Sequence, residues 1–277
     1  MTLLVRNNFF KGGILLAALS LGLTAAGTYF TFQTFPEAVA SAAMRSWELI
    51  RPLTGDIAKT SDYVPLGSML GAAVYSLIGI IFISHFFEKT QSPEILFFGF
   101  FVVSLSFEFA RLMIPLQICY DLPAMYLISG SRLLLFGRFF GLFSLFAASV
   151  YAAGLDIQKQ QNVLFSIIVA TLLITLNVPI DSLVWDSTLI PISGYSAMFS
   201  LVEIGTVAVT IFTFMISAYI HNSRTYVFIA LSIIMIYIGR KLVFNSDTWI
   251  FLFPGFIILA AATWFVCVLL RREYLWL

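Results

Sequence analysis

Eight continuous apolar stretches, each close to the length needed to cross a bilayer, constrain this sequence more than any other feature. A bilayer core about 30 Å thick needs roughly 20 apolar residues in a helix that rises about 1.5 Å per residue. Lipid offers backbone groups no hydrogen-bond partners, so each stretch is predicted to be an α-helix. The stretches are residues 12–32, 66–86, 95–117, 124–148, 163–178, 195–220, 226–244 and 250–270.

The composition supports the same class of protein. Hydrophobic residues make up 60% of the 277 residues and charged residues 10%, whereas an average soluble domain is about 25% charged. So few charges would not cover the surface of a soluble protein, and a net charge of +1 argues against nucleic acid as a partner. We therefore predict an all-α, polytopic integral membrane bundle, in which residues 1–277 form a single membrane domain in contact with the lipid bilayer.

The first stretch has a second interpretation as a signal peptide. Arg6 and Lys11 precede it, and the small residues of positions 24–26 resemble a cleavage site. However, the apolar stretch continues as far as Phe32, which is long enough to span. We predict an uncleaved helix and eight spans, or seven spans if the first is a cleaved signal.

Charged residues in the loops predict the orientation of the chain. With eight spans, both termini and every second loop lie on one side of the membrane, and that side collects most of the basic residues. The positive-inside rule therefore predicts cytoplasmic termini, in the inner (plasma) membrane of a bacterium. The predicted inner side holds Arg6, Lys11, Lys89, Lys159, Arg224, Arg271 and Arg272, and the outer loops hold Asp56, Asp62, Asp121, Asp181, Asp186 and Asp247.

Two outer loops are long enough to have structure of their own. Residues 33–65 are predicted to carry an amphipathic helix that begins at Pro36 and lies on the membrane interface, with Trp47 as its anchor. The alternative is that this helix covers a cavity. Residues 179–194 are expected either to re-enter the membrane or to cross its surface.

Seven ionisable side chains inside the predicted spans are the best candidates for function. Given the predicted orientation, all seven lie in the outer half of the membrane. Each costs up to about 2.5–3.5 kcal/mol at the bilayer centre, so they are expected to find partners. Five bases and two acids leave a formal charge of +3 among Glu108, Arg111, Arg132, Arg138, Glu203, Arg240 and Lys241.

The spacing of these residues predicts how some of them pair. Glu108 and Arg111 are three residues apart on one helix face. Arg138 and Glu203 are too deep to reach the interface easily, and we predict that they meet between the fourth and sixth spans. At least one arginine then lacks a carboxylate, and its guanidinium suits an anionic group, which it can bind with two hydrogen bonds. The alternative is that these charges only hold helices together.

A polar stripe follows one face of the sixth span at three- and four-residue steps. Small hydroxyl residues of this kind are typical of close helix packing, and the alternative is the wall of a water-filled path with Glu203 at its mouth. The path-lining residues would be Thr206, Thr210, Thr213 and Ser217. In the fourth span, Gly130, Gly137 and Gly141 also favour close helix packing.

No residue pattern points to catalysis, a metal or a cofactor. Cys119 and Cys267 are predicted at opposite membrane surfaces, too far apart for a disulfide. His85 and His221 lie at predicted inner ends, remote from the acidic residues. We therefore predict no metal site and no cofactor, and an enzyme is not the leading hypothesis.

Three functional hypotheses follow from these features. The first is a transporter or channel-like carrier of a small anionic solute, which would bind in an outward-facing basic pocket. The second is a membrane sensor or assembly subunit, which would bind a ligand, a membrane protein partner or a second copy of itself without transport. The third is an enzyme that acts on lipid head groups, which the absence of an evident nucleophile or metal set makes weaker.

Overall fold

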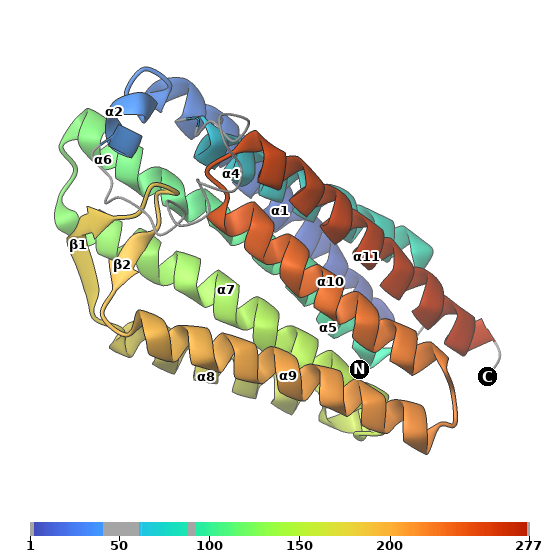
Figure 1. Cartoon of the computed structure of the whole chain (residues 1–277). Helices are drawn as coiled ribbons and strands as arrows, with labels where there is room; N and C mark the ends of the chain where they lie inside the picture. The colour runs from blue at the N-terminus through green and yellow to red at the C-terminus, as the bar shows by residue number, and fades with distance from the viewer. Residues whose placement is uncertain (1–2, 41–60, 62, 88–91, 276–277) are drawn as a thin grey trace, which may run out of the picture.

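The predicted spans form long helices that lie beside one another in one bundle (Figure 1). The computed structural model describes residues 3–40, 61, 63–87 and 92–275, and in this part eight helices are long and apolar enough to cross a membrane. The prediction of an all-α, multi-pass membrane bundle is confirmed. The helices are α1 (Leu3–Thr31), α4 (Val64–Phe86), the third span from Pro93 to Tyr120, α7 (Ala124–Ala152), α8 (Gln160–Asn177), α9 (Ser196–Ile220), α10 (Thr225–Asn245) and α11 (Trp249–Leu275).

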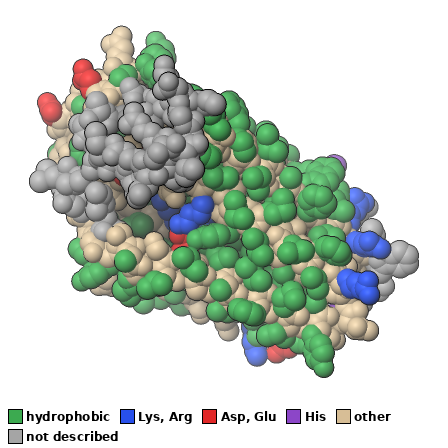
Figure 2. All heavy atoms as spheres, viewed as in Figure 1, with side chains coloured by type: hydrophobic (Ala, Val, Ile, Leu, Met, Phe, Trp, Pro, Cys, Tyr) green, Lys and Arg blue, Asp and Glu red, His purple; other side chains and the backbone are tan. Residues whose placement is uncertain are grey.

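The two ends of the bundle differ in what they carry. The end with both chain termini, here called the termini end, also holds the turn between α7 and α8 (Figure 1). The opposite end, here called the hairpin end, holds a two-stranded hairpin and the short helix α2 (Phe35–Ala40). Between the ends, hydrophobic side chains cover most of the surface that Figure 2 shows, as expected for a surface that faces lipid.

The main hydrophobic core lies between α1, α4, α10, α11 and the first helix of the third span. Its fully buried side chains include Ile83, Phe101, Ile236 and Ala262. The pair α10 and α11 packs closely because Gly239 lets the two backbones approach. A Cβ atom at Gly239 would lie 2.9 Å from the backbone nitrogen of Leu259.

The third span is not the continuous α-helix that its apolar sequence predicts. It consists of α5 (Pro93–Ser104), a 3₁₀ segment η3 (Leu105–Leu112) and α6 (Met113–Tyr120). Two local features favour the break. Pro115 has no N–H to donate to the preceding turn, and the hydroxyls of Ser104 and Ser106 donate to carbonyl oxygens three residues earlier, at 2.6 and 2.7 Å. In a 3₁₀ helix, residues three apart eclipse each other, so η3 aligns Glu108 with Arg111.

The glycines of α7 pack against this 3₁₀ segment and α5, as their spacing predicts. A Cβ atom at Gly137 or Gly141 would come closer than 3.0 Å to Phe107 or Ser104, respectively. The missing side chains therefore allow a close approach of two helices. This approach places Arg138, the neighbour of Gly137, beside Glu108, the neighbour of Phe107.

The loop of residues 179–194 folds as a β-hairpin at the hairpin end. Strand β1 (Ile180–Trp185) pairs antiparallel with β2 (Pro191–Ser193). At the turn, the Asp186 N–H donates to the carbonyl of Ile190 at 2.9 Å.

The tip of the hairpin is buried in the bundle rather than exposed. Thr188 and Leu189 are both fully buried, and Leu189 has a φ of 57°, a left-handed conformation that few side chains adopt. Next to them, the Ser187 hydroxyl donates to Asp247, between α10 and α11, at 3.1 Å. The loop therefore closes onto the helices instead of crossing the surface as an open segment.

Most of the predicted interfacial helix of residues 33–65 lies outside the described residues. Only its start is described: α2 begins at Phe35 and has Pro36 in its first turn. Phe35 is fully buried in a small core at the hairpin end, together with Leu127 and Leu189. Trp47 lies outside the described residues.

Candidate functional site

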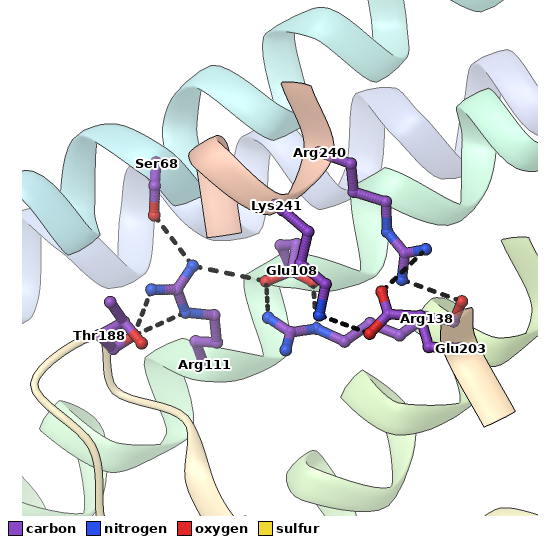
Figure 3. A network of polar contacts seen from close by, with 8 residues as sticks. All are labelled: Ser68, Glu108, Arg111, Arg138, Thr188, Glu203, Arg240 and Lys241. Carbon is purple, nitrogen blue, oxygen red and sulfur yellow. Dashed lines mark hydrogen bonds and ion pairs between the residues drawn. The ribbon is translucent and has the colours of Figure 1, made fainter. Parts of the chain in front are cut away.

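Six of the seven charged residues predicted inside the spans form one network in the hairpin half of the bundle (Figure 3). They come from η3, α7, α9 and α10, four segments that are far apart in the sequence. A hydrogen bond of 3.2 Å from Arg240 Nη2 to the carbonyl of Arg138 joins the two halves of the network. We call this network the basic cluster, and its members are Glu108, Arg111, Arg138, Glu203, Arg240 and Lys241.

Glu108 is the most enclosed acid of the basic cluster. It is 1% exposed and receives hydrogen bonds from two arginines. Arg138 donates from Nε and Nη2 to the two carboxylate oxygens, each at 2.8 Å. Arg111 Nη1 lies 3.4 Å from Oε2, which confirms the predicted pair of Glu108 and Arg111. The carboxylate thus compensates buried positive charge from two elements, η3 and α7.

Arg111 links η3 to α4 and to the hairpin. Its Nη1 donates to the Ser68 hydroxyl at 2.9 Å, and its Nε donates to the carbonyl of Thr188, also at 2.9 Å. Its Nη2 donates to the same carbonyl. All three nitrogens of this buried guanidinium are therefore engaged within the chain, as Figure 3 shows.

The prediction that Arg138 and Glu203 pair directly is wrong. Arg138 pairs with Glu108, whereas the Glu203 carboxylate lies 2.5 Å from Lys241 Nζ and 3.7 Å from Arg240 Nη1. The close packing of α7 on η3 directs Arg138 toward Glu108, and Glu203 on α9 faces α10 instead. Both residues nevertheless belong to the same network.

An aromatic ring fills the space between two of the arginines. The Phe244 ring centroid lies 4.7 Å from the guanidinium carbon of Arg138 and 5.3 Å from that of Arg240. Cation–π attraction of this kind stabilises positive charge where water is excluded. Phe244 therefore helps to hold two like charges near each other.

The members of the basic cluster differ in exposure: Glu108, Arg111 and Arg240 are buried, whereas three other side chains are partly exposed. The side chains of Arg138 and Glu203 are 18% and 16% exposed, and that of Lys241 is 37% exposed. In Figure 2, a small basic and acidic patch shows among hydrophobic side chains in the hairpin half of the bundle. The basic cluster thus opens to its surroundings at the α9–α10 edge, while its η3 edge is closed.

Positive charge exceeds negative charge in the basic cluster. Four bases and two acids leave a formal charge of +2. Nη1 of Arg240, which is 3% exposed, makes no hydrogen bond to any described residue. This nitrogen is itself buried and lies 3.7 Å from the Glu203 carboxylate, so it is ion-paired but not hydrogen-bonded.

The remaining predicted site residues lie apart from this network. Within the described part of the chain, no hydrogen bond or ion pair joins Arg132 to the basic cluster, and Arg132 Nε is buried without a hydrogen-bond partner. On α9, the hydroxyls of Thr206, Thr210 and Thr213 donate to carbonyls four residues earlier, at 2.7–2.8 Å. Ser217 is fully buried. Their role as the lining of a path stays a prediction.

Sequence reasoning missed three residues that contact the basic cluster. Phe244 follows Arg240 by four residues, so helix spacing was a usable signal for it. Ser68 is a single hydroxyl residue in an apolar stretch, and nothing near it in the sequence indicates a contact with Arg111. Thr188 contributes its main-chain carbonyl, which no side-chain pattern can reveal.

The chain matches no protein-family model, no curated protein and no solved structure.

Proposed function

We propose that this protein is a transporter or channel-like carrier of a small anionic solute, which binds at the open edge of the basic cluster. The observation that carries the proposal is the formal charge of +2 on largely buried side chains. Buried charge without a counter-charge is costly in an apolar bundle. A bound anion would compensate it and would accept hydrogen bonds from cationic donors.

The basic side chains of the cluster differ in whether they can donate hydrogen bonds to a bound anion. Arg240 Nη1 has an ion pair with Glu203 at 3.7 Å but no hydrogen-bond partner in the described part of the chain, and Lys241 is the most exposed base of the basic cluster. Arg138 lies beside them, bound to Glu108. We assign contact with the anion to Arg240 and Lys241. Arg111 instead holds the hairpin, because all its nitrogens are engaged.

The proposed orientation has the hairpin end facing outward and the termini in the cytoplasm of a bacterial cell. Its support is the distribution of charged residues. Lys11, Lys159 and Arg272 lie at the termini end, whereas Asp121, Asp186 and Asp247 lie near the hairpin end. Basic residues concentrate on the cytoplasmic side of membrane proteins. The basic cluster would then be reached from the outer half of the bilayer.

The alternative proposal is a sensor or assembly subunit that binds an anion, a partner protein or a second copy of the chain without transport. The hydroxyls of α9 favour it. Because Thr206, Thr210 and Thr213 donate to their own helix backbone, they offer no free donors to a solute along α9.

Solute flux into vesicles distinguishes these two proposals. We expect vesicles that contain the protein to take up one class among phosphate, sulfate and small carboxylates faster than protein-free vesicles. In Lys241→Gln, uptake should fall about tenfold, since a charge-assisted hydrogen bond contributes about 1.5–3 kcal/mol and 1.4 kcal/mol is a factor of ten. Arg272→Gln, which removes a charge at the termini end, should keep wild-type uptake. Anion binding without flux would favour a sensor that binds an anion. The absence of both anion binding and flux would contradict the transporter and leave an assembly subunit that binds a partner protein or a second copy of the chain.

A further inference from the structure

A lateral groove separates α8 from α9 in the membrane-spanning part of the bundle. Both helices pack on α7, but α8 has few contacts with α9. The resulting groove has a volume of about 890 Å³, at the upper end of the range of about 300–1,000 Å³ for ligand pockets. Its walls come from α7, α8 and α9.

The walls of the lateral groove suit a hydrocarbon chain. Most of its lining is aliphatic or aromatic, for example Phe143, Phe146, Ile167, Val202 and Val209. The hydroxyl of Thr206, which also lines the groove, is already bonded to the backbone of α9. An empty groove would forfeit the van der Waals contacts of its walls, and a lipid chain restores them.

The termini end of the lateral groove carries a basic side chain. Lys159 and Asn162 line it there, where α8 begins. The Lys159 side chain is 59% exposed, and its ion pair with Asp156, which is 71% exposed, measures 3.3 Å. Such exposed pairs contribute little, so the ammonium group can exchange its partner for a phosphate. A basic group at the end of a groove between membrane helices suits an anionic lipid head group.

We propose that the lateral groove binds an anionic phospholipid from the leaflet at the termini end. Its phosphate would lie at Lys159 and Asn162, and an acyl chain would extend between α7, α8 and α9 toward Val202. This site is separate from the basic cluster, which lies toward the hairpin end of the bundle.

The outer face of α1 provides a matched comparison. It also carries a lysine near the termini end, Lys11, above a shallow depression that is lined by α1 alone. Both surfaces contain an open glycine: a Cβ atom at Gly205 in the groove or at Gly22 on α1 would meet no atom within 4 Å. A side chain added at either position is therefore accommodated without a clash.

Native mass spectrometry of the purified full-length chain tests the proposal. We expect bound phosphatidylglycerol on the wild type, in preference to phosphatidylcholine. Gly205→Phe fills the groove and should weaken phosphatidylglycerol binding about tenfold, which is about 1.4 kcal/mol, whereas Gly22→Phe should bind as the wild type does. Lys159→Gln should lose the preference for the anionic lipid, and Lys11→Gln should keep it.

A second groove variant and a competition experiment complete the test. Ala170→Leu narrows the groove from the α8 wall and should weaken phosphatidylglycerol binding as Gly205→Phe does. The two variants together keep the test valid if one of them folds poorly. Glycerol 3-phosphate carries the head-group charge without a chain and should not compete. Equal lipid binding by Gly205→Phe and wild type, equal losses in Gly22→Phe and Gly205→Phe, or full competition by glycerol 3-phosphate would each overturn the proposal.

Discussion

Replacing Glu108 by Gln is expected to lower the free energy of unfolding by about 3–5 kcal/mol, the cost of removing one partner of a buried ion pair. The side chain keeps its shape, but Arg138 and Arg111 lose the carboxylate that compensates their charge. The Arg111 side chain is fully buried and that of Arg138 is 18% exposed, so water compensates little of the charge that the carboxylate compensates in the wild type. The measurement is unfolding of the purified protein in detergent, followed by loss of helical signal with temperature or denaturant.

Two controls separate this effect from a general sensitivity to lost charge. Asp156→Asn breaks the exposed pair with Lys159, and we expect a change of about 0–1 kcal/mol. The double variant Glu108→Gln with Arg138→Gln should lose less stability than the sum of the two single variants, because the second change removes a charge that the first left uncompensated. If Glu108→Gln were as stable as the wild type, that result would contradict the ion pairs of Glu108 with Arg138 and Arg111.

Replacing Arg111 by Leu is expected to release the hairpin and to lower the free energy of unfolding by about 3–5 kcal/mol. The substitution leaves the buried Thr188 carbonyl and Ser68 hydroxyl without their donor. Because each 1.4 kcal/mol is a factor of ten, amide hydrogen exchange at Asp186 and Leu189 should accelerate at least about tenfold. Exchange of the amides within α7 should change much less.

Arg111→Lys shows whether charge or geometry holds the hairpin. Lysine keeps the positive charge beside Glu108 but lacks the planar fork that reaches Ser68 and the Thr188 carbonyl together. We expect hairpin exchange close to that of Arg111→Leu, with a smaller loss of stability. Wild-type exchange in both variants would show that the buried tip is held by Leu189 and its apolar neighbours instead.

The span count could be predicted because a helix in lipid must be long and apolar, and that requirement is visible in the sequence. The same count predicted that all seven charged residues lie in one half of the membrane, and six of the seven meet in one network. The ion pairs among these residues were harder to predict than the number of spans. A linear sequence predicts how deep Arg138 lies but not which neighbouring helix its side chain faces.

Local features decided the contacts that sequence reasoning missed. Pro115 and two serines favour the 3₁₀ segment, which alters the direction of Glu108 within an apparently regular apolar run. The close contact of Gly137 with Phe107 then selects Glu108 over Glu203 as the partner of Arg138. The buried hairpin tip depends on a main-chain carbonyl and on a left-handed leucine, neither of which has a composition signal.

Anion-dependent stabilisation tests the central claim, a basic site for an anionic group, most directly. The measurement is the midpoint of thermal unfolding of the purified protein in detergent, with phosphate, sulfate and small carboxylates at matched ionic strength and with neutral solutes as controls. We predict that one anion class raises the midpoint of the wild type and has no such effect on Lys241→Gln. In that variant, Arg240 still pairs with the Glu203 carboxylate. A wild-type midpoint that no anion raises above the matched controls would contradict the proposed site.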